Sequence, residues 1–203
     1  MKTNTIVFDG KNNIAWIVAL LAEALRRPGG VVLVPTETVY GLIARAADEI
    51  ACKRIFELKN RPVEKRIGWF ISDWGKLENF GVAIEGLPTL LAERFMPGAL
   101  TVIAPTCGGG TQGIRIPDHP LLSALLKEFD EPLVQTSANA SGNPDPLSAA
   151  DALAQLHGEV DAAVDGGDLL PGATGSTVVD ATGEKVKVLR YGALGIENFS
   201  DLM

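Results

Sequence analysis

The chain has 203 residues, 46% of them hydrophobic, and a formal net charge of −7. This length and hydrophobic content predict one domain over residues 1–203 with a substantial core, and they exclude a largely disordered chain. The acidic balance argues against a non-specific binder of nucleic acids or membrane surfaces, which would need a basic face, but it is compatible with a local basic pocket.

The cysteines, histidines and apolar runs exclude further classes of protein. Cys52 and Cys107 are too few for a disulfide framework. His119 and His157 are isolated, so no spacing resembles a zinc site. The N-terminus lacks the apolar region of a signal peptide, and the longest apolar stretch, 14–25, is too short to span a bilayer. A cytoplasmic protein without membrane attachment is therefore expected.

The first part of the chain contains two predicted helices and a predicted strand between them. Apolar residues recur at helical spacing over 14–25, and Pro28-Gly29-Gly30 is expected to end this helix. The run VVLVP at 31–35 is short, apolar and β-branched, which predicts a buried strand. A second helix is expected over 48–60. Its expected buried residues are Ile50, Ile55 and Leu58.

The rest of the chain alternates short strands with helices. Strands are expected at 67–72, 99–105, 113–117, 132–139, 161–165, 176–180 and 185–190. Helices are expected at 87–95, 120–129 and 148–157, the last of them capped by Ser148. This alternation predicts an α/β or intermixed α+β domain with one mixed sheet.

The basic cluster KNRPVEKR at 59–66 is the first candidate for a binding site. The sequence has no G-x-x-x-x-G-K-[ST] loop, so bound phosphates would need scattered cations and backbone amides. Cations at the end of a helix also stabilise the helix dipole, which is a sufficient structural explanation on composition alone. Pro62 favours a binding role, because it would end the helix and hold Arg61 extended, so that the side chains can converge.

Three further segments combine polar side chains with predicted strand ends. PTETVYG at 35–41 carries three hydroxyls before a glycine, and TSANASG at 136–142 combines small residues with Ser137 and Asn139. GSTVVD at 175–180 can present backbone amides to an anion. The first two segments also fit ordinary turns whose hydroxyls are satisfied locally, so both interpretations stay open for them.

Two arginines outside the basic cluster are also candidates for binding anions. Arg190, in VLRYG, lies near the end of a predicted strand and can pair bidentately with phosphate or form a surface ion pair. Arg115, in GIRIP, has an apolar residue on both sides, so its strand is expected to be half buried. A half-buried arginine needs a carboxylate, either from the protein or from a ligand.

Taken together, these segments resemble the YrdC-type L-threonylcarbamoyladenylate synthase family. The strings PTETVYGL, LKNRPVEK, RFMPGALTVI, GIRIPDHP, TSANASG, STVVD and VLRYG follow the order of that family over residues 35–192. The length of the chain resembles the single-domain form. The resemblance implies a YrdC-like domain, in which a twisted mixed β-sheet is flanked by helices around a large concave cavity.

The resemblance also implies a nucleotidyltransferase activity. Members of the family join L-threonine, bicarbonate or CO₂, and ATP into L-threonylcarbamoyl-AMP and release pyrophosphate, and a separate complex transfers the threonylcarbamoyl group to adenosine 37 of tRNA. The carbamate of threonine attacks the α-phosphorus itself, so catalysis needs positioning and electrostatics but no protein nucleophile. Mg²⁺ is expected with the triphosphate, although no acidic pair indicates its ligands.

Matching positions imply roles for individual residues. The ATP-binding residues implied by the resemblance are Lys59, Arg61, Lys65, Thr111, Asn139 and Arg190, with Lys59 and Arg61 giving electrostatic catalysis. The implied threonine-binding residues are Thr36, Thr38, Tyr40, Arg115, Ser137 and Ser176. Within this set, Arg115 is suited to the carboxylate of the amino acid.

The chain departs from the family pattern at several positions. Arg66-Ile67 stands where the family usually has Pro-Leu. Phe70 stands at about the position where the family has a histidine that contacts threonine. Ala99 replaces a common proline, and Gly175 replaces a glutamate or proline. Two alternatives therefore stay open: an enzyme that forms a carbamoyl-adenylate for another acceptor, and a paralogue without synthase activity that binds RNA, including tRNA, on its concave surface.

Overall fold

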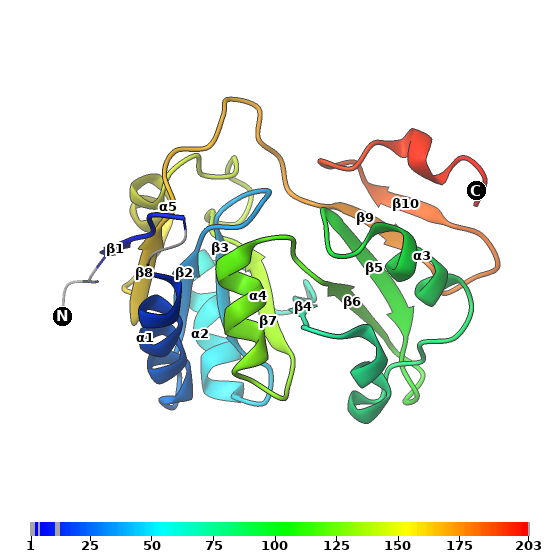
Figure 1. The fold of residues 1–203 in the computed structure, drawn as a ribbon, viewed down its shortest axis with the longest axis horizontal. Coiled ribbons are helices and arrows are strands. Elements are labelled where there is room, and N and C mark those ends of the chain that lie inside the picture. Colours follow the sequence, from blue (N-terminus) through cyan, green and yellow to red (C-terminus); the bar gives the residue numbers. More distant parts are fainter. Residues whose placement is uncertain (1–2, 4, 11–12, 203) are drawn as a thin grey trace.

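A computed structural model describes residues 3, 5–10 and 13–202 of the chain (Figure 1). The strands are β1 (Thr5–Val7), β2 (Val32–Val34), β3 (Gly41–Arg45), β4 (Gly68–Phe70), β5 (Leu100–Pro105), β6 (Thr111–Arg115), β7 (Leu133–Ser137), β8 (Ala162–Asp165), β9 (Thr177–Asp180) and β10 (Lys187–Arg190). The helices are α1 (Ile14–Arg26), α2 (Glu49–Lys59), α3 (Leu87–Phe95), α4 (Pro120–Lys127) and α5 (Ala149–Gln155), with 3₁₀ helices η1 (Trp74–Phe80) and η2 (Ile196–Phe199).

The strands of the described residues form one ten-stranded mixed sheet in the order β1-β8-β2-β3-β7-β4-β6-β5-β9-β10. The sheet contains both parallel pairs, such as β2 with β8, and antiparallel pairs, such as β3 with β7. The predicted α/β class with one mixed sheet and flanking helices is therefore confirmed. No helix within the described part of the chain is long and apolar enough to cross a membrane.

Helices cover both faces of the part of the sheet that runs from β1 to β7 (Figure 1). Side chains alternate along each strand, so Val32 and Val34 pack with α1 and α4, whereas Leu33 packs with α2 and α5 on the other face. Because both faces are buried, these strands are continuous apolar runs, which explains why VVLVP could be predicted as a strand.

The part of the sheet that runs from β6 to β10 has a separate core. Leu100, Val102 and Ala104 of β5 pack there with α3, η1 and η2. β4, which has three residues, pairs with β7 on one side and with β6 on the other. This short strand is the sheet's connection between its two parts.

The structure corrects two expectations about α2. Ile50 is 65% exposed, because the buried face of the helix runs through Ala51, Ile55 and Leu58, and Ile50 lies to one side of it. Pro62 is also not the residue that ends the helix. Asn60 ends it in the left-handed conformation, with φ 47° and ψ 47°.

Several elements were not predicted from the sequence. β3 follows the PTETVYG segment directly, and β1, η1 and η2 were also not foreseen. All the predicted helices and strands are present, with ends that differ by a few residues. The Ser148 cap is confirmed, since its hydroxyl accepts a hydrogen bond from the amide of Asp151 at 3.0 Å.

Candidate functional site

A cavity of about 280 Å³ lies where the two parts of the sheet meet. Its lining comes from the connection between β2 and β3, from segment 61–68, and from β5, β6, β7, β9 and β10. The predicted residues that line it are Thr36, Thr38, Tyr40, Arg61, Thr111, Arg115, Ser137, Ser176 and Arg190. Residues far apart in the sequence are thus brought together in one cavity.

Three arginines that line the cavity have only neutral hydrogen-bond acceptors. Arg61 donates to the carbonyl oxygens of Lys65 at 3.3 Å and Arg66 at 2.9 Å. Arg66 donates to the carbonyl oxygen of Thr111 and to its hydroxyl at 3.0 Å. Arg190 donates from Nη2 and Nε to the carbonyl oxygen of Ser176, at 2.7 and 3.1 Å.

These guanidinium groups have no carboxylate in direct contact, although the charge of Asp145 opposes the effect of burial on the pKa of Arg190. Among the described residues, none of the three forms an ion pair with a carboxylate. Burial and the positive charge of Arg190 lower the pKa of Arg61, so these two groups lie close enough to repel each other. Preoriented guanidinium groups without an ion-pair contact are suited to binding a polyanion such as a polyphosphate chain.

Lys59 lies beside this cavity but does not line it. Its side chain is 1% exposed, and its ammonium group donates to the carbonyl oxygens of Ser137 and Asn139 and to Oδ1 of Asn139 at 3.2 Å. Burial and the neighbouring charge of Arg61 lower the pKa of Lys59 to about 8, against an opposing effect of Asp145. In this arrangement Lys59 holds the loop that follows β7.

Two other predicted ATP-binding residues are also outside the lining. Lys65 is exposed on the turn that Arg61 braces. Asn139 is engaged in its own loop, where its Oδ1 accepts a hydrogen bond from Ser137 at 2.5 Å and its Nδ2 donates to the carbonyl oxygen of Asn143 at 2.7 Å. The roles of Lys59, Lys65 and Asn139 toward ATP stay predictions.

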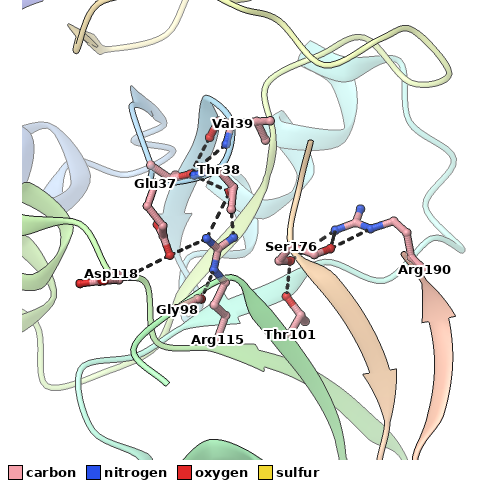
Figure 2. A network of polar contacts seen from close by, with 10 residues as sticks. Glu37, Thr38, Val39, Gly98, Thr101, Arg115, Asp118, Ser176 and Arg190 are labelled. Atoms are coloured by element: carbon pink, nitrogen blue, oxygen red, sulfur yellow. Dashed lines mark hydrogen bonds and ion pairs between the residues drawn. The ribbon is translucent and has the colours of Figure 1, made fainter. Parts of the chain in front are cut away.

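Arg115 forms the centre of a buried polar network on another wall of the cavity (Figure 2). Its Nε donates to the carbonyl oxygen of Gly98 at 3.0 Å, and Nη1 and Nη2 donate to the hydroxyl of Thr38 at 3.2 and 3.1 Å. Glu37 supplies the expected carboxylate, 2.6 Å from Nη2. These contacts leave an Nη1 N–H for a ligand, because a guanidinium has five donors.

The PTETVYG segment is shaped by its own hydroxyls. Thr36 Oγ1 accepts hydrogen bonds from the amides of Thr38 at 3.0 Å and Val39 at 3.1 Å, and it donates to the carbonyl of Val39 at 2.7 Å. The Tyr40 hydroxyl donates to the carbonyl of Gly167 at 2.7 Å. Burial is the main reason that the pKa of Tyr40 rises to about 12. This segment is therefore both a self-satisfied turn and a wall of the cavity.

Ser176 connects the Arg190 wall to β5. Its hydroxyl lies 2.7 Å from Thr101 Oγ1, and its carbonyl holds the guanidinium of Arg190 (Figure 2). Gly175 is adjacent, and a Cβ placed there would lie 3.2 Å from Arg190 Nη2. The glycine at this position therefore leaves room for the arginine.

Some lining residues were missed by sequence reasoning. They include Arg66, Thr101, Gln135, Thr136 and Asp145. Arg66 was visible as part of the basic cluster but lies outside the family pattern. The contributions of Thr101 and Asp145 depend on tertiary packing, and no local signal identifies them.

Asp145 is the one carboxylate among the described lining residues. No cluster of three or more histidine, cysteine or acidic side chains suited to a metal ion occurs within the described ranges. One carboxylate is compatible with Mg²⁺, which in nucleotide sites is held by one or two carboxylates together with substrate phosphates and water. The cavity fits a metal that arrives with its ligand better than a metal bound by the protein alone.

Comparisons with known proteins agree with this geometry. The family model of Sua5, YciO and YrdC proteins, described as telomere recombination, matches residues 24–192. The threonylcarbamoyl-AMP synthase of Pyrococcus abyssi is 35% identical over 98% of this chain and 61% of its own length. The synthase of that name from Bacillus subtilis is 41% identical over 85% of this chain and 53% of its own length.

A solved structure of P. abyssi Sua5 complexed with L-threonine superposes with a TM-score of 0.86 at 34% identity, covering 99% of this chain and 61% of that one. The chain therefore spans less than two thirds of the length of the first curated relatives it matches. Since the family model covers most of the sequence and the relatives align over nearly all of it, the chain belongs to the Sua5/YciO/YrdC family.

Proposed function

We propose that this chain catalyses the ATP-dependent synthesis of L-threonylcarbamoyl-AMP from L-threonine and bicarbonate or CO₂, with release of pyrophosphate. The observation that carries the proposal is the pairing, in one cavity, of the Arg115–Thr38 network with three arginines that lack an ion-pair contact. The first feature is suited to a triphosphate, and the second is suited to a small amino acid with a carboxylate and a hydroxyl. The names of the relatives support the same reaction.

The phosphate end of the cavity supplies electrostatic catalysis. The carbamate oxygen of threonine attacks the α-phosphorus of ATP, the bond to the bridging oxygen breaks, and pyrophosphate leaves with its electron pair. Arg61 and Arg190 stabilise the charge that builds up on the phosphate oxygens. No protein nucleophile is needed, and the described lining residues include no cysteine, histidine or lysine.

The amino-acid end of the cavity positions the attacking group. Arg115 is held rigid by Gly98, Thr38 and Glu37, so its remaining N–H is preoriented for the threonine carboxylate. Ser137 and Ser176 add hydroxyls to the same cavity. Mg²⁺, bound with ATP, would supply further charge neutralisation at the phosphates. Asp145, the one carboxylate among the described lining residues, would help to hold it.

The proposed product is the donor for modification of tRNA adenosine 37 by a separate transfer complex. The choice of acceptor amino acid depends on the wall around Phe70, which stands at about the position of a histidine in the family pattern. Phe70 is 1% exposed, and the guanidinium carbon of Arg115 lies 5.6 Å from its ring centroid. An apolar ring behind Arg115 favours, as a second candidate, a carbamoyl-adenylate synthase for another amino acid.

The test is to incubate the chain with ATP, L-threonine, bicarbonate and Mg²⁺, and to measure pyrophosphate together with the mass of the adenylate formed. Threonine-dependent release of pyrophosphate is expected. Release with a different amino acid from a panel would establish the second candidate. No release with any acceptor, together with tRNA binding that ATP does not disturb, would replace both by an RNA-binding role.

A further inference from the structure

Segment 59–66 presents a different cation to the cavity than the family pattern predicts. Both Lys65 and Arg66 are exposed residues, but Arg66 lines the cavity and Lys65 does not. The two residues are adjacent, and Arg61 binds the carbonyl oxygens of both, which holds this turn of the backbone in place. Arg66 is the residue of the pair whose guanidinium reaches β6, at Thr111.

The surroundings of Arg66 are suited to binding an anion. Its protein acceptors, the carbonyl and hydroxyl oxygens of Thr111, are neutral. Arg61 donates a hydrogen bond to the carbonyl oxygen of Arg66. The positive charge of Arg190 also lowers the pKa of Arg61, so these two guanidinium groups repel each other. Asp145 is the one described carboxylate on the lining, and within the described residues it forms no ion pair with these arginines.

We infer that Arg66 binds the phosphate chain of the nucleotide and, with Arg61 and Arg190, forms a site of three guanidinium groups for a polyphosphate. The inference rests on the proposed ATP-dependent reaction and adds a residue where the family usually has proline. Thr111 fixes one edge of the Arg66 guanidinium, which leaves its other N–H groups for phosphate oxygens. Arg66 thereby connects the basic segment to β6 across the cavity.

Direct binding measurements test this inference without relying on catalysis. Calorimetry with ATP and with inorganic tripolyphosphate, both without threonine, should show binding of each ligand to the unaltered chain. Arg66→Ala should weaken both by at least about tenfold, because each charge-assisted hydrogen bond contributes appreciably to affinity. Lys53→Ala is the matched control, since Lys53 is an exposed cation on α2 paired with Glu57.

Two further variants separate phosphate binding by Arg66 from its structural hydrogen bond to Thr111. Arg66→Gln keeps a donor for the Thr111 carbonyl but removes the charge, so it should lose affinity as Arg66→Ala does. Lys65→Ala should lose less affinity than Arg66→Ala. The inference is overturned if Arg66→Gln binds tripolyphosphate as tightly as the unaltered chain, if Lys65→Ala shows the larger loss, or if the unaltered chain binds neither ligand.

The two possible failures can be told apart. If both ligands bind through Arg66 but no amino acid gives pyrophosphate, the proposed reaction fails and the polyphosphate site stands. If threonine-dependent pyrophosphate release occurs and Arg66→Ala has unchanged affinity for ATP, the reaction stands and the role of Arg66 is overturned.

Discussion

The ammonium group of Lys59 is buried against three neutral oxygens of the loop that follows β7. Burying a cation without a carboxylate partner costs free energy, which is why its pKa is lowered to about 8. In return, the hydrogen bonds of Lys59 fix the end of β7 at Ser137, a residue of the cavity wall, and the loop that follows it. The residue is therefore expected to affect stability as well as binding.

The pH dependence of stability should reveal this buried lysine. An unfolded lysine titrates near pH 10.4, so between about pH 8 and pH 10.4 the unfolded chain binds a proton that the native chain does not. The native state therefore gains stability as pH rises through this window, by up to about 1.4 kcal/mol per pH unit. Denaturant unfolding of the unaltered chain and of Lys59→Met at several pH values measures the effect.

The unfolding free energy of the unaltered chain minus that of Lys59→Met should increase from pH 8 to pH 10. Lys53→Met, at an exposed position on the same helix, is the control and should show no such trend. A difference that stays constant across the window would mean that Lys59 titrates normally in the native state.

Gly175 shows how a single missing side chain can position an arginine. An alanine Cβ there would lie 3.2 Å from Arg190 Nη2, so the guanidinium must move by a few tenths of an ångström. Gly175→Ala should therefore weaken ATP binding by about 0.5–1.5 kcal/mol, the cost of a displaced side-chain rotamer. Calorimetric titration with ATP measures this.

The matched control for this change is Gly183→Ala, since a Cβ at Gly183 meets no atom within 4 Å. It should leave ATP affinity unchanged. Equal affinities for the two variants would show that the position of Arg190 in this structure does not matter for the nucleotide.

At the scale of elements, the end of α2 sets the direction of the basic segment. The amide of Asn60 donates to the carbonyl of Glu57 at 3.1 Å, and the amide of Arg61 donates to the carbonyl of Phe56 at 2.9 Å. This is the Schellman arrangement, with Asn60 in the left-handed conformation. The motif, rather than Pro62, turns the chain so that Arg61 reaches the cavity.

Substitutions at Asn60 should separate backbone conformation from side-chain chemistry. Asn60→Val places a β-branched residue in the left-handed region and should reduce the unfolding free energy by about 1–2 kcal/mol. It should also weaken ATP binding, because Arg61 is displaced. Asn60→Gly, which tolerates this conformation, should retain ATP affinity. Thermal unfolding and ATP titration test both, and equal ATP affinity in the two variants would contradict the proposed link.

Elements with strong apolar periodicity were predicted well from the sequence. Elements whose conformation depends on pairing with distant strands were predicted poorly. α3 agrees with its predicted bounds because its apolar pattern and flanking residues are local signals. β3 was missed because GLIAR follows a hydroxyl-rich turn, and its strand character comes from pairing with β2 and β7. Likewise, residue propensities could not predict that Arg66 would line the cavity and Lys65 would not, because this depends on the conformation of the turn.

At the scale of the whole molecule, the cavity exists because two parts of one sheet meet at β4. The sequence could predict which segments carry polar groups, since each segment is a local string. It could not predict that Arg115 would take its carboxylate from Glu37, which is 78 positions earlier in the chain, and not from a ligand alone. Long-range packing also placed Lys59 behind the cavity, although its sequence neighbour Arg61 lines it.

Arg115 links the two parts of the molecule independently of the sheet. It belongs to β6 and binds Thr38 and Glu37 of the connection between β2 and β3. The side chain of Arg115 is 4% exposed and that of Glu37 is 19% exposed. Removing the arginine leaves Glu37 without its cationic partner, although its carboxylate keeps a hydrogen bond from the amide of Asp118 at 2.8 Å.

Arg115→Met should therefore lower the unfolding free energy by about 3 kcal/mol and loosen the junction at β4. Hydrogen exchange should speed up at β4 and in the 35–40 segment, while the amides of α1 keep their protection, because α1 lies in a separate core cluster against another part of the sheet. The double variant Glu37→Gln/Arg115→Met removes the unpaired charge and should regain part of the lost stability. If it is as unstable as Arg115→Met, the penalty arises from lost packing against Phe70 and not from the stranded carboxylate, and the role of the ion pair in joining the two parts is refuted.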